Sequence, residues 1–158
     1  MTRPLHTARL IALLTPALAL GGALGSQYLG GLYPCEMCHW QRWPHYAALV
    51  IALAAFAIGT GKGTRPLVLL AGLAIFISGA VGIFHAGVEY RWWEGLTTCS
   101  SLANTASGGD ILSRIIAAPI VRCDVPQWTF AGISLAGFNA LLSIPAAIAI
   151  WVLCLKRS

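Results

Sequence analysis

The chain has 158 residues, of which 58% are hydrophobic and only 9% are charged. A soluble domain carries about 25% charged residues, so this composition excludes an ordinary soluble protein and indicates a membrane protein. The formal net charge is +5, but the basic residues form no stripe interleaved with aromatic side chains, which argues against a nucleic-acid partner.

Long uncharged apolar segments predict four transmembrane helices, because a spanning helix needs roughly 20 apolar residues. These segments cover residues 10–29, 43–59, 67–88 and 128–155. We therefore expect an all-α membrane protein, a single domain over residues 1–158 folded as a four-transmembrane-helix bundle. A short loop at 30–42 and a longer one at 89–127 would lie at the same end of this bundle.

The charges that flank the apolar segments predict their orientation. One end has basic residues and no acidic ones: Arg3, Arg9, Lys62, Arg65, Lys156 and Arg157. All acidic residues lie toward the other end: Glu36, Glu89, Glu94, Asp110 and Asp124. Because basic loops stay on the cytoplasmic side, we expect cytoplasmic termini and outward cysteine-bearing loops. The first segment could also be a secretory signal, but it exceeds the roughly 7–15 residues of a signal core, which favours a retained helix.

The cysteines fall into two outward groups and one inward residue. Cys35 and Cys38 form a C-x-x-C motif before the second apolar segment, and Cys99 and Cys123 share the longer loop. Cysteines on an oxidising face form disulfides. Three connectivities are possible, and we favour Cys35–Cys38 with Cys99–Cys123 because each pair shares a loop. Cys154 lies toward the cytoplasmic end, where we expect a small apolar filler.

The C-x-x-C motif is interpreted as redox-active, because so small a disulfide ring restrains the fold little. Unpaired N–H groups at a helix start stabilise a thiolate, and Arg42 adds a permanent cation one turn after Cys38. Three other interpretations stay open. The string C-E-M-C-H from Cys35 to His39 has the form of a c-type haem attachment site. The same residues could bind zinc, or the disulfides could be inert parts of a scaffold.

In the longer loop, residues 110–118 predict a short helix that rests on the membrane surface. The composition of residues 104–109 indicates flexibility. We expect these features to let the loop's disulfide move relative to the C-x-x-C pair, as exchange between disulfides requires.

Together these features resemble the DsbB family. The resemblance rests on C-x-x-C followed by Gln41-Arg42, on the Cys99/Cys123 pair, and on the stretch from Cys123 to Asn139. It covers essentially the whole chain and implies a quinone-dependent dithiol oxidoreductase of the bacterial inner membrane. The catalytic residues it implies are Cys35, Cys38, Cys99 and Cys123.

The resemblance also implies a path for the electrons. A reduced periplasmic carrier of the DsbA type would attack Cys99 and release Cys123. Cys123 would then exchange with Cys35 and free the thiolate of Cys38. The acceptor would be ubiquinone or menaquinone, held at the membrane by the residues near Cys38.

Two residues are expected to bind the quinone. Arg42 would stabilise developing anions, and His85, at a similar depth in the third segment, would hydrogen-bond or protonate a quinone oxygen. His39 and His45 are weaker candidates. The alternatives that remain are a paralogue that serves one dedicated thiol partner, and a membrane haem subunit with histidine ligands.

Overall fold

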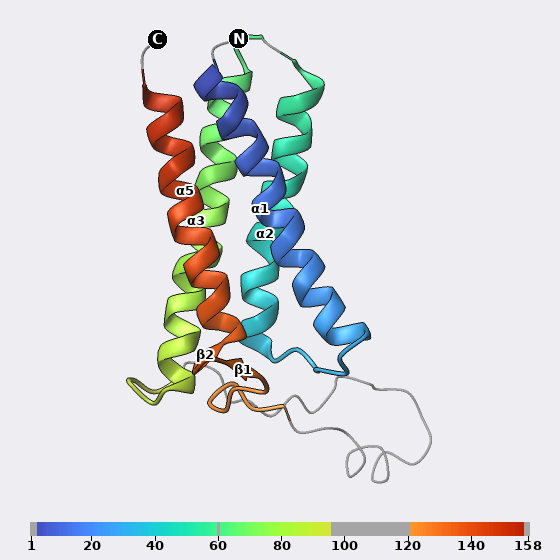
Figure 1. Cartoon of the computed structure of the whole chain (residues 1–158), viewed down its shortest axis with the longest axis vertical. Helices are drawn as coiled ribbons and strands as arrows, with labels where there is room; N and C mark the ends of the chain where they lie inside the picture. Colours follow the sequence, from blue (N-terminus) through green and yellow to red (C-terminus); the bar gives the residue numbers. More distant parts are fainter. Residues whose placement is uncertain (1–2, 60, 96–120, 157–158) are drawn as a thin grey trace, which may run out of the picture.

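The structure, a computed structural model, describes residues 3–59, 61–95 and 121–156. The described residues form the helices α1 (Arg3–Tyr28), α2 (Glu36–Ala57), α3 (Thr64–Glu89) and α5 (Leu135–Leu155), with the short strands β1 (Thr129–Phe130) and β2 (Ile133–Ser134). The helices pack side by side as a bundle, in which α3 lies against α2 and α5 (Figure 1). Cys99 and the predicted surface helix at 110–118 lie outside the described residues.

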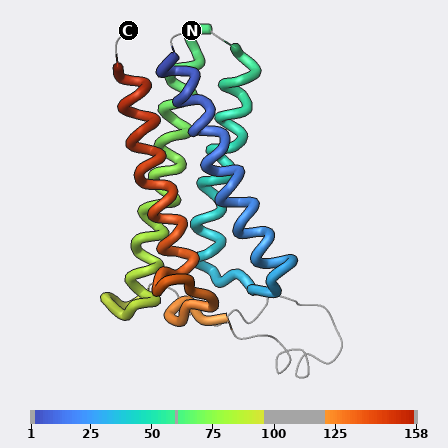
Figure 2. Tube along the Cα trace, in the orientation of Figure 1, coloured from blue at the N-terminus to red at the C-terminus, as the bar shows by residue number. Residues whose placement is uncertain are grey.

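Within the described part of the chain, α1, α3 and α5 are long and apolar enough to cross a membrane. The 22-residue helix α2 begins with polar turns, and its apolar part starts at Trp43. Both termini lie at one end of the bundle, together with the α2–α3 connection. The α1–α2 connection and the strands lie at the other end (Figure 2). The predicted helical bundle is present, and the two predicted groups of loops lie at its opposite ends.

The second and fourth helices begin at residues different from those expected. Helix α2 begins at Glu36 rather than at 43, because Cys35 is its N-cap and the Cys35 sulfur accepts the N–H of Cys38 at 3.2 Å. Helix α5 begins at Leu135 rather than at 128, with Ser134 as its N-cap. Residues 129–134 form a hairpin instead, whose two turn residues have positive φ angles. The hairpin residues are largely apolar and uncharged, so in the sequence they look continuous with the apolar helix that follows them.

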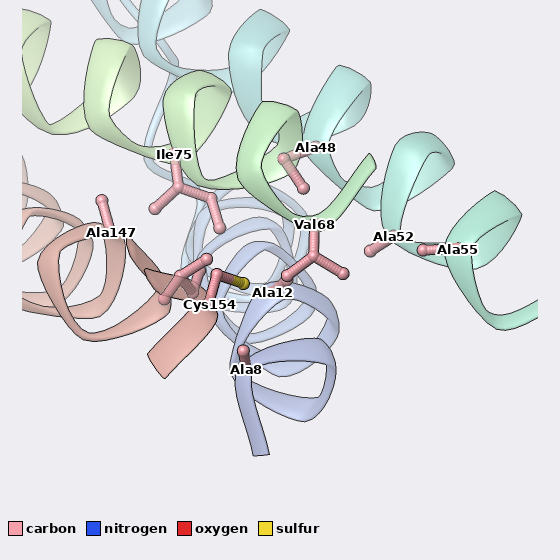
Figure 3. Close-up of a cluster of buried hydrophobic side chains, with 11 residues drawn as sticks. Ala8, Ala12, Ala48, Ala52, Ala55, Val68, Ile75, Ala147 and Cys154 are labelled. Atoms are coloured by element: carbon pink, nitrogen blue, oxygen red, sulfur yellow. The ribbon is translucent and has the colours of Figure 1, made fainter. Parts of the chain in front are cut away.

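The core toward the termini is built mainly from alanines (Figure 3). These alanines come from all four described helices: Ala8, Ala12, Ala48, Ala52, Ala55, Ala71 and Ala147. They surround Val68 and Ile75 of α3, and small side chains let helix backbones approach closely inside a membrane. Cys154 is buried in the same cluster, with 3% of its surface exposed, as its predicted role of apolar filler requires.

Glycines on α3 bring that helix close to α5. A Cβ atom on Gly82 would lie 3.0 Å from the carbonyl oxygen of Ala136, and a Cβ on Gly79 would lie 3.0 Å from Cβ of Ser143. Only hydrogen fits comfortably at such contacts. The close approach brings polar side chains of α5 within hydrogen-bonding distance of α2 and α3.

Candidate functional site

The C-x-x-C motif forms the first turn of α2, and its two sulfur atoms are close together. Cys35 is 3% exposed, and its Sγ lies 2.9 Å from Sγ of Cys38. A disulfide bond is about 2.05 Å long. The predicted Cys35–Cys38 disulfide is therefore not formed in this structure, and the pair is present as a dithiol in hydrogen-bond contact.

The two thiols differ in acidity because their surroundings differ. Both precede the apolar part of α2, outside the segment expected to span the membrane. The hydrogen bond with Cys38, together with burial, raises the pKa of the Cys35 thiol above its ordinary value. The same bond lowers the pKa of the Cys38 thiol, and the nearby Arg42 guanidinium acts in the same direction. In the reduced pair, Cys38 is therefore the more acidic thiol and the one that loses its proton first.

Two sulfurs and an imidazole also form a set that a metal ion could use. One donor atom each from Cys35, Cys38 and His85 lies within 4.8 Å of the others. Two sulfurs bound tetrahedrally to one zinc ion at about 2.3 Å would lie roughly 3.8 Å apart. The observed 2.9 Å suits a dithiol better than a zinc site.

Cys123, in the segment before the hairpin, lies against the C-x-x-C motif. It is 1% exposed and belongs to a buried cluster with Cys35, Met37 and Val88. Thiol exchange requires one sulfur to reach another, and this packing brings Cys123 to the same buried cluster as Cys35. The position of Cys99 lies outside the described residues.

His85 of α3 reaches the cysteine pair from inside the bundle. Its Nε2 lies 3.5 Å from Sγ of Cys35 and 3.8 Å from Oε1 of Glu89. Its other ring nitrogen, Nδ1, lies 2.7 Å from the amide nitrogen of Gln41. The sequence predicts a His85 that faces the quinone, whereas the structure places it at the sulfur of Cys35.

A backbone carbonyl group determines the tautomer of His85. The amide nitrogen of Gln41 lies 3.3 Å from the carbonyl oxygen of Met37, which can only accept, so this end of the amide is the donor. Gln41 therefore also donates to Nδ1 of His85, and the ring proton lies on Nε2. His85 can thus donate to a thiolate on Cys35, which stabilises negative charge there.

A chain of buried amides continues from this site into the bundle. Asn139 of α5 donates to Oε1 of Gln41 at 2.8 Å and to the carbonyl oxygen of Ser78 at 3.2 Å. Its Oδ1 lies 2.9 Å from Nε2 of His45 and accepts from the hydroxyl of Ser143 at 2.9 Å. Since unpaired polar groups are costly inside a membrane, these bonds hold α2, α3 and α5 together.

Arg42 lies one turn after Cys38 on α2 and faces α1. Its guanidinium donates to the side chain of Gln27 and, at 3.2 Å, to the carbonyl oxygen of Ala23, both on α1. These bonds anchor the cation between α1 and α2. The charge of Arg42 therefore has a definite position relative to Cys38.

Two cavities meet at Cys38 and Arg42. The larger, of about 250 Å³, lies between α1, α2 and α5 and is lined mostly by apolar side chains. The smaller, of about 50 Å³, lies toward the loops and is lined by Cys35 and His85 among others. Cys38 and Arg42 line both, so the more acidic sulfur of the dithiol borders a mainly apolar space inside the bundle.

Sequence reasoning missed several polar residues of this site. The sequence pattern assigns no site role to Asn139, Ser143 or Glu89, and Gln41 enters only as part of the motif that resembles the family. Each is a polar residue within or at the end of a long apolar helix, and this placement is itself a signal of function. His39, by contrast, is exposed and lines neither cavity.

Comparison with known proteins agrees with this geometry. Residues 6–153 match the family described as Disulfide bond formation protein DsbB. Disulfide bond formation protein B of Chromohalobacter salexigens is 31% identical over 167 aligned positions, which cover 94% of this chain and 92% of that protein. Proteins of the same name from a Polaromonas species and from Aromatoleum aromaticum are 28% and 29% identical. They cover 92% and 87% of this chain, and 87% and 86% of their own lengths are matched. No solved structure gives a significant match.

A bundle of apolar helices with a reactive dithiol and a third cysteine at one end defines a multi-pass membrane thiol–disulfide oxidoreductase. The family match gives the same answer independently. The chain belongs to the DsbB family, and its activity is that of a disulfide-forming oxidoreductase. The predicted family is confirmed, and the family favours thiol exchange over haem attachment at the C-E-M-C-H string.

Proposed function

We propose that the protein reoxidises a DsbA-like dithiol carrier in the periplasm and passes the electrons to a membrane quinone. The observation that carries the proposal is the position of Cys38. Its sulfur contacts Cys35 on one side, and its side chain lines the larger apolar cavity on the other. A dithiol placed in this way can take electrons from a water-soluble partner and deliver them to a lipid-soluble acceptor.

The first part of the path is exchange between cysteines. The carrier's two thiols reduce a Cys99–Cys123 disulfide, which leaves the carrier oxidised. Cys123 attacks Cys35 of an oxidised C-x-x-C pair, and Cys38 leaves as a thiolate. Cys99 then attacks Cys123, which restores the Cys99–Cys123 disulfide and leaves Cys35 and Cys38 reduced. The packing of Cys123 against Cys35 supports this order.

Cys38 is the better leaving group of the pair because its pKa is lowered. Cys35, by contrast, has its negative charge stabilised by the Nε2–H of His85 once its own proton is lost. We therefore propose that His85 serves the cysteine exchange rather than the quinone. Its role differs from the one that the sequence predicts, although the residue is the same.

The larger cavity fits a quinone ring in its chemistry. A bound quinone supplies an acceptor for two electrons and two protons. The lining residues offer apolar surface for the ring, the cation of Arg42 for an oxygen, and the thiol of Cys38 beside it. A buried acceptor atom on His45 that lacks a partner among the described residues also fits a polar ligand here. Arg42 stays charged at any working pH and stabilises anions nearby.

The orientation follows from the same proposal. We place the protein in the bacterial inner membrane with both termini in the cytoplasm, because the basic residues gather at the end that holds the termini. The end that carries the C-x-x-C motif then faces the periplasm. Labelling of cysteines with a membrane-impermeant maleimide, added to one side of the membrane at a time, tests this orientation. A Cys38 thiol that reacts only from the cytoplasmic side would contradict it.

The direct test is anaerobic turnover with a reduced thioredoxin-fold carrier and a short-chain ubiquinone. One quinone should be consumed for each carrier disulfide formed. Arg42→His should weaken the apparent affinity for quinone more than that for the carrier. Carrier oxidation without loss of quinone would overturn the proposal. A carrier that keeps its attacking cysteine but lacks its second cysteine should stay bound to the oxidised protein as a mixed disulfide, and the cysteine that holds it is the first one attacked.

A further inference from the structure

The larger cavity has a polar lining residue that the proposed electron path does not use. His45 follows Arg42 by three residues on α2, so it lies about one turn deeper on the same side of the helix. Its imidazole lines the cavity together with Cys38 and Arg42, and only 3% of the residue is exposed. This histidine is therefore next to the space proposed for the quinone ring.

The hydrogen bonds of Asn139 determine where His45 carries its proton. The amide nitrogen of Asn139 faces the carbonyl oxygen of Ser78, which can only accept, so Oδ1 is the atom that faces His45. Nε2 of His45 lies 2.9 Å from this Oδ1 and must carry the hydrogen. In the neutral ring, Nδ1 then carries no hydrogen and can only accept a hydrogen bond.

This acceptor is buried, and among residues 3–59, 61–95 and 121–156 it has no hydrogen-bond partner. A buried polar atom without a partner is unfavourable in apolar surroundings. The other ring nitrogen is already bonded, so the ring has one place left for a ligand. A ligand that offers a hydroxyl group would satisfy it, whereas a ligand with only carbonyl oxygens would not.

Resting on the proposed function, we propose that His45 is a quinol-selective residue of the quinone site and accepts a hydrogen bond from a hydroxyl of the reduced ring. The oxidised ring has carbonyl oxygens that cannot donate, so it gains nothing from the bare Nδ1. Arg42 has only donors, and both a carbonyl oxygen and a hydroxyl oxygen can accept from it. The preference for the reduced ring therefore comes from His45.

The test measures binding without electron transfer. The full-length protein with Cys35→Ser and Cys38→Ser is titrated with a short-chain ubiquinone and, separately, with its quinol. His45→Leu should weaken quinol binding about 3–10-fold, the loss expected for one hydrogen bond, and should leave quinone binding nearly unchanged. His39→Leu is the matched control on the same helix, because His39 is exposed and lines neither cavity, and it should change neither affinity.

The outcomes separate this inference from the proposed function. If the redox-inert protein binds neither form, both are overturned. If it binds both forms but His45→Leu weakens them equally or not at all, the proposed function stands and the role of His45 is overturned.

A second measurement covers the case in which His45→Leu does not fold. In the ¹⁵N-histidine-labelled redox-inert protein, with resonances assigned by replacing His6, His39 and His85 one at a time, Nδ1 of His45 should shift when quinol is added and not when quinone is added. The absence of a quinol shift would overturn the role of His45.

Discussion

Gln41 of α2 and His85 of α3 meet inside the bundle, where the amide nitrogen of Gln41 lies 2.7 Å from Nδ1 of His85. The other end of the same amide accepts from Asn139 of α5 at 2.8 Å. One side chain therefore links the sulfur chemistry at the helix start to the packing of three helices. Changes at Gln41 should affect both.

Gln41→Leu leaves Nδ1 of His85 buried without its donor and removes one of the hydrogen bonds of Asn139, which keeps its bonds to Ser78. A buried polar group left unpaired costs about 1–3 kcal/mol, so thermal unfolding in detergent, followed by circular dichroism, should begin at a clearly lower temperature. Gln127→Leu is the control, because Gln127 is exposed and its side chain donates to the carbonyl oxygen of Tyr33 in the α1–α2 connection. Equal effects of the two substitutions would contradict the importance of the buried amide.

Cys38 and Cys154 should differ completely in their effect on turnover. Cys38→Ser removes the thiol between the two cavities and should abolish quinone reduction. Cys154→Ala removes one sulfur from an alanine-lined core and should leave turnover near normal. The rate of quinone consumption with a reduced carrier is the measurement. Similar losses in both variants would mean that the cysteines act through stability alone.

The acidity of Cys38 gives a prediction about pH. A thiol reacts as its thiolate, so a lowered pKa moves the midpoint of alkylation below that of an ordinary thiol. Arg42→Gln removes a nearby cation, which should raise the pKa of Cys38 and move the midpoint to higher pH. The iodoacetamide rate at Cys38 in the reduced protein, read by mass spectrometry, is the measurement.

Arg65→Gln, at the opposite end of the bundle, serves as the control for this experiment. It should leave the midpoint unchanged. A midpoint that is the same with and without Arg42 would show that the Cys35 hydrogen bond alone sets the acidity of Cys38.

Substitution by alanine should have different effects on stability at two glycines. Gly82→Ala places a methyl group 3.0 Å from the carbonyl oxygen of Ala136 and should destabilise the contact between α3 and α5. Gly21→Ala, in α1, meets nothing within 4 Å and should be neutral, or stabilising by up to about 1 kcal/mol. Thermal unfolding of the two variants is the comparison. A stable Gly82→Ala protein would show that the two helices can separate without loss.

The sequence predicts the helical bundle and the family because both depend on local patterns. Apolar runs mark the helices, and the spacing of Cys35 and Cys38 marks the motif. It does not predict the hairpin at 129–134, because positive φ at Ala131 is unusual for a residue with a side chain.

The site itself could be predicted only in part. The sequence brings Arg42 near Cys38 because they share one helix. It could not place His85 against Cys35 or join His45 to Asn139, because those contacts depend on how separate helices are rotated about their axes. The close contacts of the α3 glycines with α5 likewise involve two separate segments, so neither segment alone reveals them.

The amide chain also bears on how the polypeptide is inserted during synthesis. Gln41 and Ser78 precede Asn139 in the chain, so α2 and α3 are synthesised before Asn139 is available. Until α5 joins them, the side chains of Gln41 and Ser78 lack the hydrogen bonds that Asn139 donates. A displacement of α5 by one residue would carry Asn139 to another side of that helix. We therefore expect the insertion of α5 to select the correctly packed bundle, because only the correct register of α5 forms the hydrogen bonds between Asn139 and the two earlier helices.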